Sequence, residues 1–328
     1  MQNFAYINAG SVEQVPKLLS AKWGETKVIA GGTDLLGELK EYIETPKKVI
    51  NLKTIPGLDT IKEDASGLTI GALTTIADIA AHPTIQREYT ALAQAAGVVA
   101  SPQIRNMGTL GGNLCQRPRC WYYRAEDIVC LKKGGDKCYA LSGLNKYHAI
   151  FGGGPVYIVH PSDTAPALIA LGATVKIVGP EGEQLMSLED FFMLPKASNP
   201  FRENVLGPQD IVVEVRIPKP KPNTRSLYIK IREKGSFDFA LSSVAAVLEM
   251  NGPTCEKSSI VLGGVAPAPW RAKEAEGVLN GARVTDAIAK QAGQAAVKNA
   301  DPMTDNAYKV PLTRNIITRA AMTAAASV

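Results

Sequence analysis

Apolar residues in the first third of the chain form short runs that glycine and proline interrupt. The runs at residues 28–30, 49–52 and 68–70 have the length of short strands, and the breaks between them predict turns. Apolar residues at helical spacing predict helices over residues 76–81 and 89–97. Strands and helices are therefore expected to mix without the regular alternation of a βαβ series.

The second half of the chain continues the mixture. Residues 155–182 predict a strand, a capped helix and a strand, and a strand follows before the proline-rich stretch 218–222. Beyond that stretch the sequence predicts antiparallel strands and then three helices, over residues 271–279, 284–299 and 311–325. The fold class is therefore α+β, and the proline-rich stretch predicts a domain boundary that divides the chain into residues 1–221 and 222–328.

Composition changes this picture little. The 328 residues are 45% hydrophobic and 20% charged, an ordinary balance for a protein of two or three domains. The net charge of +5 is spread among acidic residues, so nucleic acid binding is not implied. The chain has no signal-peptide pattern and no apolar run of about 18 residues, so we expect a cytoplasmic protein without a membrane span.

Two glycine-rich loops are candidate anion sites. VIAGGTDLL, residues 28–36, predicts a strand, a Gly-Gly turn and a helix that Thr33 or Asp34 caps, and GTLGGN occupies residues 108–113. Backbone amides at such turns attract anions, and glycine lets a phosphate approach because it has no Cβ. The residues offered for this contact are Gly31, Gly32, Thr33, Thr109, Gly111, Gly112 and Asn113. Each loop taken alone is more often a plain turn, and neither matches the G-x-G-x-x-G pattern of a Rossmann site.

Four of the five cysteines lie close together, at positions 115, 120, 130 and 138. An odd count and a tight cluster argue against a disulfide framework and favour metal binding or redox work. Thiolates suit both iron–sulfur clusters and zinc, and the spacing is not that of paired C-x2-C zinc knuckles. Both metals stay open at this point. Cys255 is expected to be a buried structural thiol.

Cations and aromatic residues surround these cysteines. Arg117, Arg119, Arg124, Lys132, Lys133 and Lys137 either offset the charge of cluster thiolates or of a bound phosphate, or simply face water. The aromatic run at residues 121–123 either shields a cluster or forms the core of a small insertion.

Several separated stretches resemble one family. They are VIAGGTDLL at 28–36, IRNMGTLGGNL at 104–114, HPSDTAPALIALGA at 160–173, LGGVAPAPWRAKEAEGVLNG at 262–281 and YKVPLTRNIITRA at 308–320. In this order they resemble the FAD-binding subunit of the molybdenum hydroxylases, the xanthine dehydrogenase and aldehyde oxidase family, over essentially the whole chain. The resemblance implies a two-part α+β FAD domain of the p-cresol methylhydroxylase type, followed by a smaller α+β C-terminal domain.

The resemblance also implies which residues bind FAD. Residues 29–36 hold the diphosphate and residues 109–113 meet the ribityl and phosphate region. Asp163 accepts a hydrogen bond from the adenosine end, whereas Val212 and Lys230 lie near the flavin ring. The full set is Ile29, Ala30, Gly31, Gly32, Thr33, Asp34, Leu35, Thr109, Gly111, Gly112, Asn113, Asp163, Val212 and Lys230. From the residues alone, Asp163 can instead be a helix N-cap and Lys230 a solvated strand residue.

A long insertion, about residues 115–152, separates Asn113 from Asp163. It resembles the insertion in the flavin subunits of 4-hydroxybenzoyl-CoA reductase and of bacterial aldehyde oxidoreductases, which carry a [4Fe-4S] cluster near the flavin. The resemblance implies three ligands, Cys120, Cys130 and Cys138. The fourth is either His148, by its position, or Cys115, by its chemistry.

The implied function is electron transfer without a catalytic residue in this chain. A large molybdopterin-binding subunit and a small [2Fe-2S] subunit would complete a heterotrimer, either alone or dimerised, with ferredoxin or NAD as outside partner. Such a complex can be exported on a partner's signal. Two other functions stay open: a self-contained FAD oxidase, and a non-enzymatic scaffold that zinc stabilises.

Overall fold

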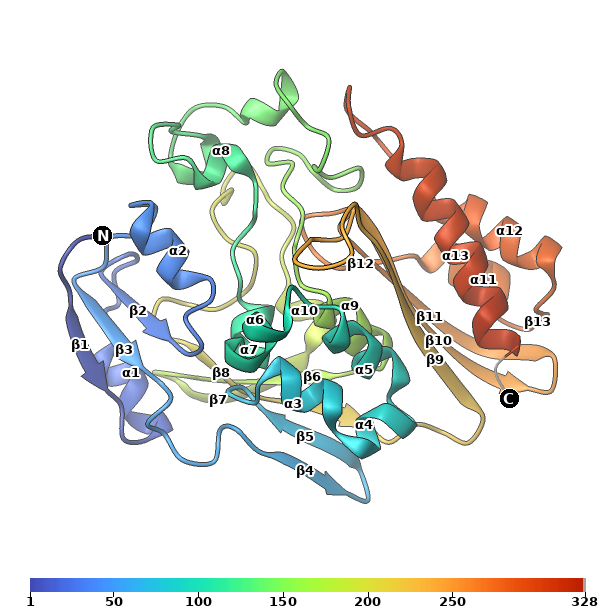
Figure 1. Ribbon diagram of the computed structural model, residues 1–328, viewed down its shortest axis with the longest axis horizontal. Coiled ribbons are helices and arrows are strands. Elements are labelled where there is room, and N and C mark those ends of the chain that lie inside the picture. The colour runs from blue at the N-terminus through green and yellow to red at the C-terminus, as the bar shows by residue number, and fades with distance from the viewer. Residues whose placement is uncertain (327–328) are drawn as a thin grey trace.

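Three β-sheets organise residues 1–326, the part of the chain that the computed structural model describes (Figure 1). The first sheet has the strand order β1-β3-β2, the second β4-β5-β8-β6-β7, and the third β12-β11-β10-β9 with β13 paired to β11. The strands are β1 (Ala5–Asn8), β2 (Thr26–Ile29), β3 (Lys48–Asn51), β4 (Ile61–Asp64), β5 (Gly67–Gly71), β6 (Thr174–Gly179), β7 (Gly182–Ser187), β8 (Ile211–Pro218), β9 (Thr224–Ile231), β10 (Ser242–Asn251), β11 (Thr254–Gly263), β12 (Trp270–Arg271) and β13 (Ala282–Arg283).

The helices cover these sheets or link them. Those of the first two sheets are α1 (Val15–Leu18), α2 (Leu35–Lys40), α3 (Ile76–Ala81), α4 (Pro83–Glu88), α5 (Thr90–Gly97), α6 (Pro102–Met107), α7 (Leu110–Leu114), α9 (Thr164–Ala170) and α10 (Leu188–Phe191), with the 3-10 helix η1 (Val12–Gln14). The third sheet carries α11 (Lys273–Leu279), α12 (Asp286–Ala296) and α13 (Lys309–Ala326).

Strand β8 joins the first two sheets because its first residues bury both faces. Ile211 and Val213 pack in the core of the parallel first sheet, whereas Val212, on the opposite face, packs in the core beneath α3 to α9. This start of the strand, IVV, is a continuous apolar run, as expected of a strand buried on both sides, and beyond it buried apolar residues alternate with Glu214 and Arg216. The two parts of the first domain therefore share a wall.

Strand β10 plays the same role for the third sheet. Ala245 and Val247 pack toward the core that includes α5 and α9, and Val244 and Leu248 pack toward the core formed with α11, α12 and α13. The successive side chains of a strand point to opposite faces, so each face of this sheet is covered by helices. Figure 1 shows α5 and α9 on one side of β9, β10 and β11, and α11 to α13 on the other.

The cysteine insertion leaves this framework between α7 and α9. It contains only single turns, α8 (Trp121–Arg124), η2 (Leu131–Lys133) and η3 (Tyr139–Leu141), joined by loops. In Figure 1 it stands above the sheets, in green around α8.

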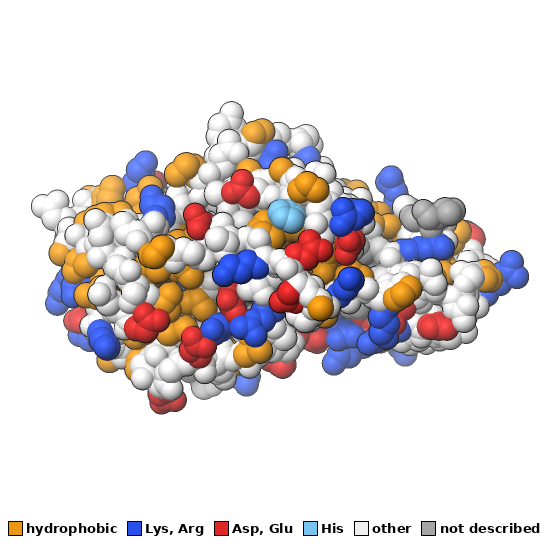
Figure 2. Space-filling view, turned by 90° about the horizontal axis from the view of Figure 1, so that it is seen from below, with side chains coloured by type: hydrophobic (Ala, Val, Ile, Leu, Met, Phe, Trp, Pro, Cys, Tyr) orange, Lys and Arg blue, Asp and Glu red, His pale blue; other side chains and the backbone are white. Residues whose placement is uncertain are grey.

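The predicted α+β class is confirmed, and the predicted helix over 76–81 has the bounds of α3. The prediction that Thr33 or Asp34 caps α2 is wrong: Asp34 occupies the N-cap position but its side chain makes no capping bond. Figure 2 shows acidic and basic side chains interspersed on one face. Among the described residues, no helix combines the length and the apolar character that crossing a bilayer requires.

Candidate functional site

The first glycine turn connects β2 to α2. Gly32 has φ +74, a left-handed conformation that glycine adopts without a steric penalty. Gly31 packs on the second loop so closely that a Cβ there would lie 1.8 Å from the Met107 carbonyl oxygen. Both glycines are therefore needed, one for the bend and the other for the contact between backbones.

The second glycine loop connects α6 to α7. The Thr109 hydroxyl caps α7 by accepting a hydrogen bond from the Gly112 amide at 3.3 Å. A Cβ on Gly111 would come within 3.0 Å of Ala72, so α7 lies tightly against the strand end below it. The two loops thus form one continuous backbone surface.

Free backbone amides line this surface. The amides of Gly31, Gly32, Thr33 and Asp34 donate to no acceptor within the described part of the chain. Backbone amides in water or against a ligand are satisfied by that environment, and consecutive amides at a turn before a helix form a nest for an anion. The diphosphate of a dinucleotide is such an anion.

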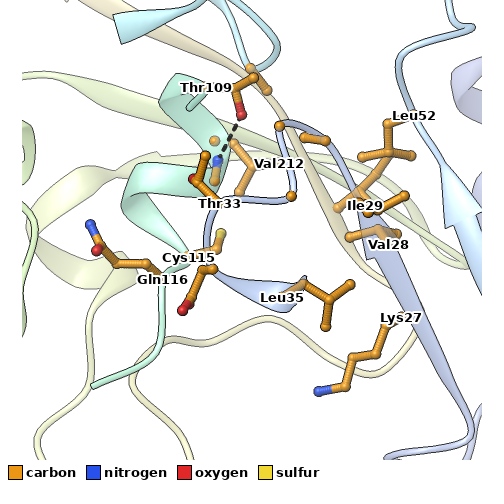
Figure 3. A pocket seen from close by; sticks show the side chains of 18 of the residues that line it. Lys27, Val28, Ile29, Thr33, Leu35, Leu52, Thr109, Cys115, Gln116 and Val212 are labelled. Carbon is orange, nitrogen blue, oxygen red and sulfur yellow. Dashed lines mark hydrogen bonds between the residues drawn. The ribbon is translucent and has the colours of Figure 1, made fainter. Parts of the chain in front are cut away.

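Two cavities, each of about 220 Å³, meet at these amides. They share Thr33, Asp34, Thr109, Gly112 and Gln116. The first has apolar walls, and Figure 3 shows Val28, Ile29 and Leu52 on one side with Thr33 and Thr109 across from them. The second lies between α6 and the loop that follows β9. A polar middle between two apolar ends fits a dinucleotide such as FAD, with its diphosphate at the amides.

The structure brings most of the predicted FAD residues together here. The first cavity is lined by Ile29, Ala30, Gly31, Gly32, Thr33, Asp34, Leu35, Thr109, Gly111, Gly112 and Val212, and the second by Thr33, Asp34, Thr109, Gly112, Asn113 and Asp163. Lys230 is the exception, because it reaches the groove only through Asp163. Val212 faces the cavity of the first glycine turn, and its predicted place beside the flavin ring stays a prediction.

Asp163 and Lys230 form a buried ion pair. Lys230 Nζ lies 2.7 Å from Asp163 Oδ2, and the Tyr228 hydroxyl donates to Asp163 Oδ1 at 2.7 Å. Burial raises the pKa of the Asp163 carboxyl, although Lys230 acts in the opposite direction. The interpretation of Lys230 as a solvated strand residue is wrong, since only 2% of its side chain is exposed. Asp163 does occupy the N-cap position of α9, but its side chain makes no capping bond, and the Ser162 hydroxyl accepts from the Ala165 amide instead.

Asp34 anchors the chain that leads into the cysteine insertion. Its Oδ2 accepts from the Arg117 amide at 2.7 Å, and its Oδ1 lies 2.7 Å from Arg124 Nη2 and 2.8 Å from Arg119 Nη1. Two of the cations that we expected to offset cofactor charge are therefore paired with a carboxylate of the protein.

Glu203 takes up two further cations of the insertion. Its carboxylate pairs with Arg117, at 3.2 Å, and with Lys132. Burial raises the pKa of Glu203, but the two cations lower it more. Neither Glu203 nor these pairs were predicted, because nothing local in the sequence marks a partner so far along the chain.

Three cysteines of the insertion share one local design. Cys120, Cys130 and Cys138 occupy the N-cap positions of α8, η2 and η3. Thiolates are favoured at the positive ends of helical turns. None of the three side chains makes a capping hydrogen bond. Cys130 and Cys138 are near enough to Cys120 to raise its pKa. Burial is the largest cause, and the pKa of Cys120 rises to about 11.

The two candidates for a fourth ligand lie in different places. His148 contacts Cys120, with 3.3 Å between Nε2 and Sγ. Cys115 instead lines the first cavity of the dinucleotide groove, beside Gly111 and Gly112, where burial raises its pKa to about 12. All five cysteines are reduced, and Cys255 is buried as expected.

His148 has the properties of a neutral ligand. Burial, and then the nearby Lys309 ammonium, lower its pKa to about 4, so the imidazole is uncharged at neutral pH. Its Nδ1 is buried and finds no hydrogen-bond partner among residues 1–326. No group of three or more His, Cys, Asp or Glu side chains in the described chain is placed to hold a single metal ion.

A further cavity, of about 320 Å³, lies between the cysteine insertion and the groove. Cys120 and His148 line it on one side, and Asp163 and Phe239 on the other. Phe239 and the exposed Phe237 also line the second groove cavity, and the sequence analysis missed both. They sit in a polar loop without periodicity, where a pair of phenylalanines between turn residues was the only available signal.

Comparisons with known proteins agree with this geometry. Residues 2–220 match the family described as FAD binding domain in molybdopterin dehydrogenase, and residues 227–324 match the CO dehydrogenase flavoprotein C-terminal domain. The chain is 38% identical to the aldehyde oxidoreductase FAD-binding subunit PaoB of Escherichia coli, over 89% of each chain.

Similarity extends to carbon monoxide dehydrogenases. The chain is 27% identical to the carbon monoxide dehydrogenase medium chain of Hydrogenophaga pseudoflava, over 97% of this chain and 95% of that one. A solved carbon monoxide dehydrogenase structure from the same organism superimposes with a TM-score of 0.78, covering 99% of this chain and 97% of that one. The molecule therefore shares both the fold and the domain order of these proteins.

Proposed function

Because the chain belongs to the FAD-binding family of the molybdopterin dehydrogenases, we propose that it is the flavin subunit of a molybdenum hydroxylase and that its cysteine insertion holds a [4Fe-4S] cluster. The observation that carries the flavin assignment is that four consecutive free amides line the first cavity, and that the second cavity meets it at the last two of them, Thr33 and Asp34. Bound FAD supplies exchange between one-electron and two-electron transfer, and the protein supplies position and electrostatics.

Each residue of the groove has a proposed task. The amides of residues 31–34 hold the diphosphate, and Thr109 fixes the second loop against it. The apolar wall around Leu52 receives one end of the dinucleotide. Asp163, held by Lys230 and Tyr228, presents a fixed carboxylate to the other end, and Phe239 covers that end from the loop after β9.

The cluster assignment rests on three thiols at the starts of helical turns, with a neutral imidazole against one of them. We propose Cys120, Cys130, Cys138 and His148 as its ligands, because Cys115 lies in the dinucleotide groove instead. A bound cluster supplies one-electron transfer.

The partners follow from the relatives. Proteins named as the FAD-binding subunit of an aldehyde oxidoreductase, the medium chain of a carbon monoxide dehydrogenase and the FAD subunit of a nicotinate dehydrogenase match this chain over most of its length. We propose that it assembles with a large molybdopterin-binding subunit and a small [2Fe-2S] subunit. Electrons would pass between these subunits and an outside partner, a ferredoxin or NAD.

Anaerobic purification followed by flavin, iron and sulfide analysis tests the proposal. We expect one FAD and about four irons per chain, with a yellow-brown spectrum. Cys130→Ser should lose the iron and keep the flavin, and Cys255→Ser, which removes a buried thiol elsewhere, should keep both. Zinc in place of iron would contradict the cluster, and a colourless protein would contradict the whole proposal.

A further inference from the structure

The segment that carries His148, residues 145–149, is fastened to the start of α13 in the C-terminal domain. Asn145 is fully buried and makes a reciprocal contact with residues 304–305. Its Nδ2 donates to Thr304 Oγ1 at 2.9 Å, and its Oδ1 accepts from the Asp305 amide at 2.8 Å. These hydrogen bonds hold together two segments that are far apart in the sequence.

Asn306 fastens the histidine itself. Its side chain is fully buried, and its Nδ2 donates to the carbonyl oxygens of His148, at 3.1 Å, and Ala149, at 3.2 Å. Both bonds lie in the interior, where an unpaired carbonyl is costly.

Tyr308 and Lys309, at the start of α13, complete the contact. The Tyr308 hydroxyl donates to the Lys146 carbonyl at 3.0 Å, and Lys309 Nζ donates to the Tyr147 carbonyl at 2.9 Å. Four consecutive carbonyls, those of residues 146–149, thus accept from three side chains of residues 306–309. The segment has no regular secondary structure, so these donors take the place of a helix or strand ladder.

We propose that Asn145 and Asn306 are positioning residues that hold His148 against Cys120, so that the C-terminal domain fixes one corner of the cluster site. The inference rests on the proposed function for the identity of the cluster. We refer to the hydrogen bonds between residues 145–149 and residues 304–309 as the α13 clasp. Without the clasp, the backbone at His148 loses its donors and the imidazole loses its fixed distance to Cys120.

Glu233 makes an exposed contact to the same segment, and this contact can be compared with the buried ones. Glu233 accepts from the Tyr147 hydroxyl at 2.9 Å and pairs with Lys146, but both charged side chains of that pair are more than a third exposed. Exposed pairs contribute little. We therefore expect the buried clasp, and not Glu233, to place the histidine.

The test compares matched variants of the full-length, FAD-loaded chain. Asn306→Ala removes the side chain, and Asn306→Asp keeps its shape but removes the donor. Thr313→Val, also on α13, removes a buried hydrogen bond to Ser242 of β10. Glu233→Ala removes the exposed contact to Tyr147. The readouts are amide hydrogen exchange over residues 145–149, iron content, and the EPR spectrum and reduction potential of the cluster.

In both Asn306 variants we expect exchange over residues 145–149 to become about tenfold faster, as for the loss of a buried hydrogen bond. Iron content should fall, or the EPR spectrum and potential should shift, while the other two variants match the wild type. Unchanged exchange in the Asn306 variants, or equal changes in Thr313→Val, would overturn the clasp. Faster exchange with an unaltered iron signal would overturn its positioning role. A wild-type chain without iron would contradict the cluster assignment. The hydrogen-exchange rates over residues 145–149 would still test the clasp in that case.

Discussion

The dinucleotide groove and the cysteine insertion are built from different materials. The groove is made of backbone: two glycine turns in contact, a capped helix and strands that pack in two cores. The insertion is made of side chains on loops and single turns, held by arginine–carboxylate pairs and by the α13 clasp. A backbone site is complete before its ligand arrives. A side-chain site on loops depends on its supporting contacts, so the two regions should respond differently to substitution.

Lys230→Met should have the largest effect on the groove side. It leaves the Asp163 carboxylate buried without its cation, which we expect to cost about 3–5 kcal/mol of unfolding free energy. Urea unfolding measures this cost, and adding Asp163→Asn should recover part of it. As a control, Lys221→Met breaks the pair that this exposed lysine makes with Glu249 and should leave the free energy of unfolding almost unchanged. Equal costs would show that the groove does not depend on this buried pair.

Gly31→Ala should break the contact between the two turns. The added Cβ would meet the Met107 carbonyl, and we expect a loss of about 1–3 kcal/mol in unfolding free energy and a weaker hold on FAD. Gly37→Ala, in open space on α2, should instead be neutral or stabilise by up to about 1 kcal/mol. Flavin content after gel filtration and chemical unfolding check both. Iron content should stay normal in each variant if the two regions are independent.

A pH series on Lys309→Met sharpens the comparison from the insertion side. Burial lowers the pKa of Lys309 to about 7 in the folded chain, below the ordinary lysine value near 10.4. Between these values the unfolded chain binds more protons, so the stability of the wild type should rise with pH, by at most about 1.4 kcal/mol per pH unit.

Lys309→Met should lack that rise. Urea unfolding of both proteins at several pH values from 6.5 to 9.5, in the absence of iron, makes the comparison, since groups common to both cancel in the difference. Parallel pH profiles would mean that the ammonium is not held in a dry site.

Cys115→Ser should have the smallest effect. Because Cys115 lies in the groove and His148 lies against Cys120, the variant should keep its iron, and its affinity for FAD should change only a few-fold. His148→Ala should lose iron or change its EPR spectrum. The reverse result, with iron lost from Cys115→Ser alone, would move the fourth ligand into the groove and abolish the separation of the two regions.

Local features were predictable from the sequence. The strand, turn and helix start around Gly31 and Gly32 depend on residues that are close in the sequence, and the two glycines predict the turn. The same holds for the helix at 76–81, which Thr75 caps. The proline-rich domain boundary, the individual FAD contacts and the cluster ligands stay predictions.

Long-range pairing was not predictable. Asp34 has the sequence position of a cap, but arginines more than 80 residues away take its carboxylate. Lys230 lies between two isoleucines in the alternating pattern of a strand, and only the fold shows that its side chain pairs with Asp163. The choice between Cys115 and His148 has the same cause: the sequence offers one by its chemistry and the other by its position, and only the fold shows that His148 contacts Cys120 while Cys115 lines the groove.

Strand β10 is covered by helices on both faces, so the packing of the C-terminal sheet depends on helices of the preceding domain. Ala245, Val247 and Val261 lie in one core with residues of α5 and α9. A fragment beginning after the proline-rich stretch would therefore expose an apolar sheet face and should aggregate when produced alone. Chimaeras that exchange this fragment between relatives should remain soluble only when α5 and α9 are transferred with it.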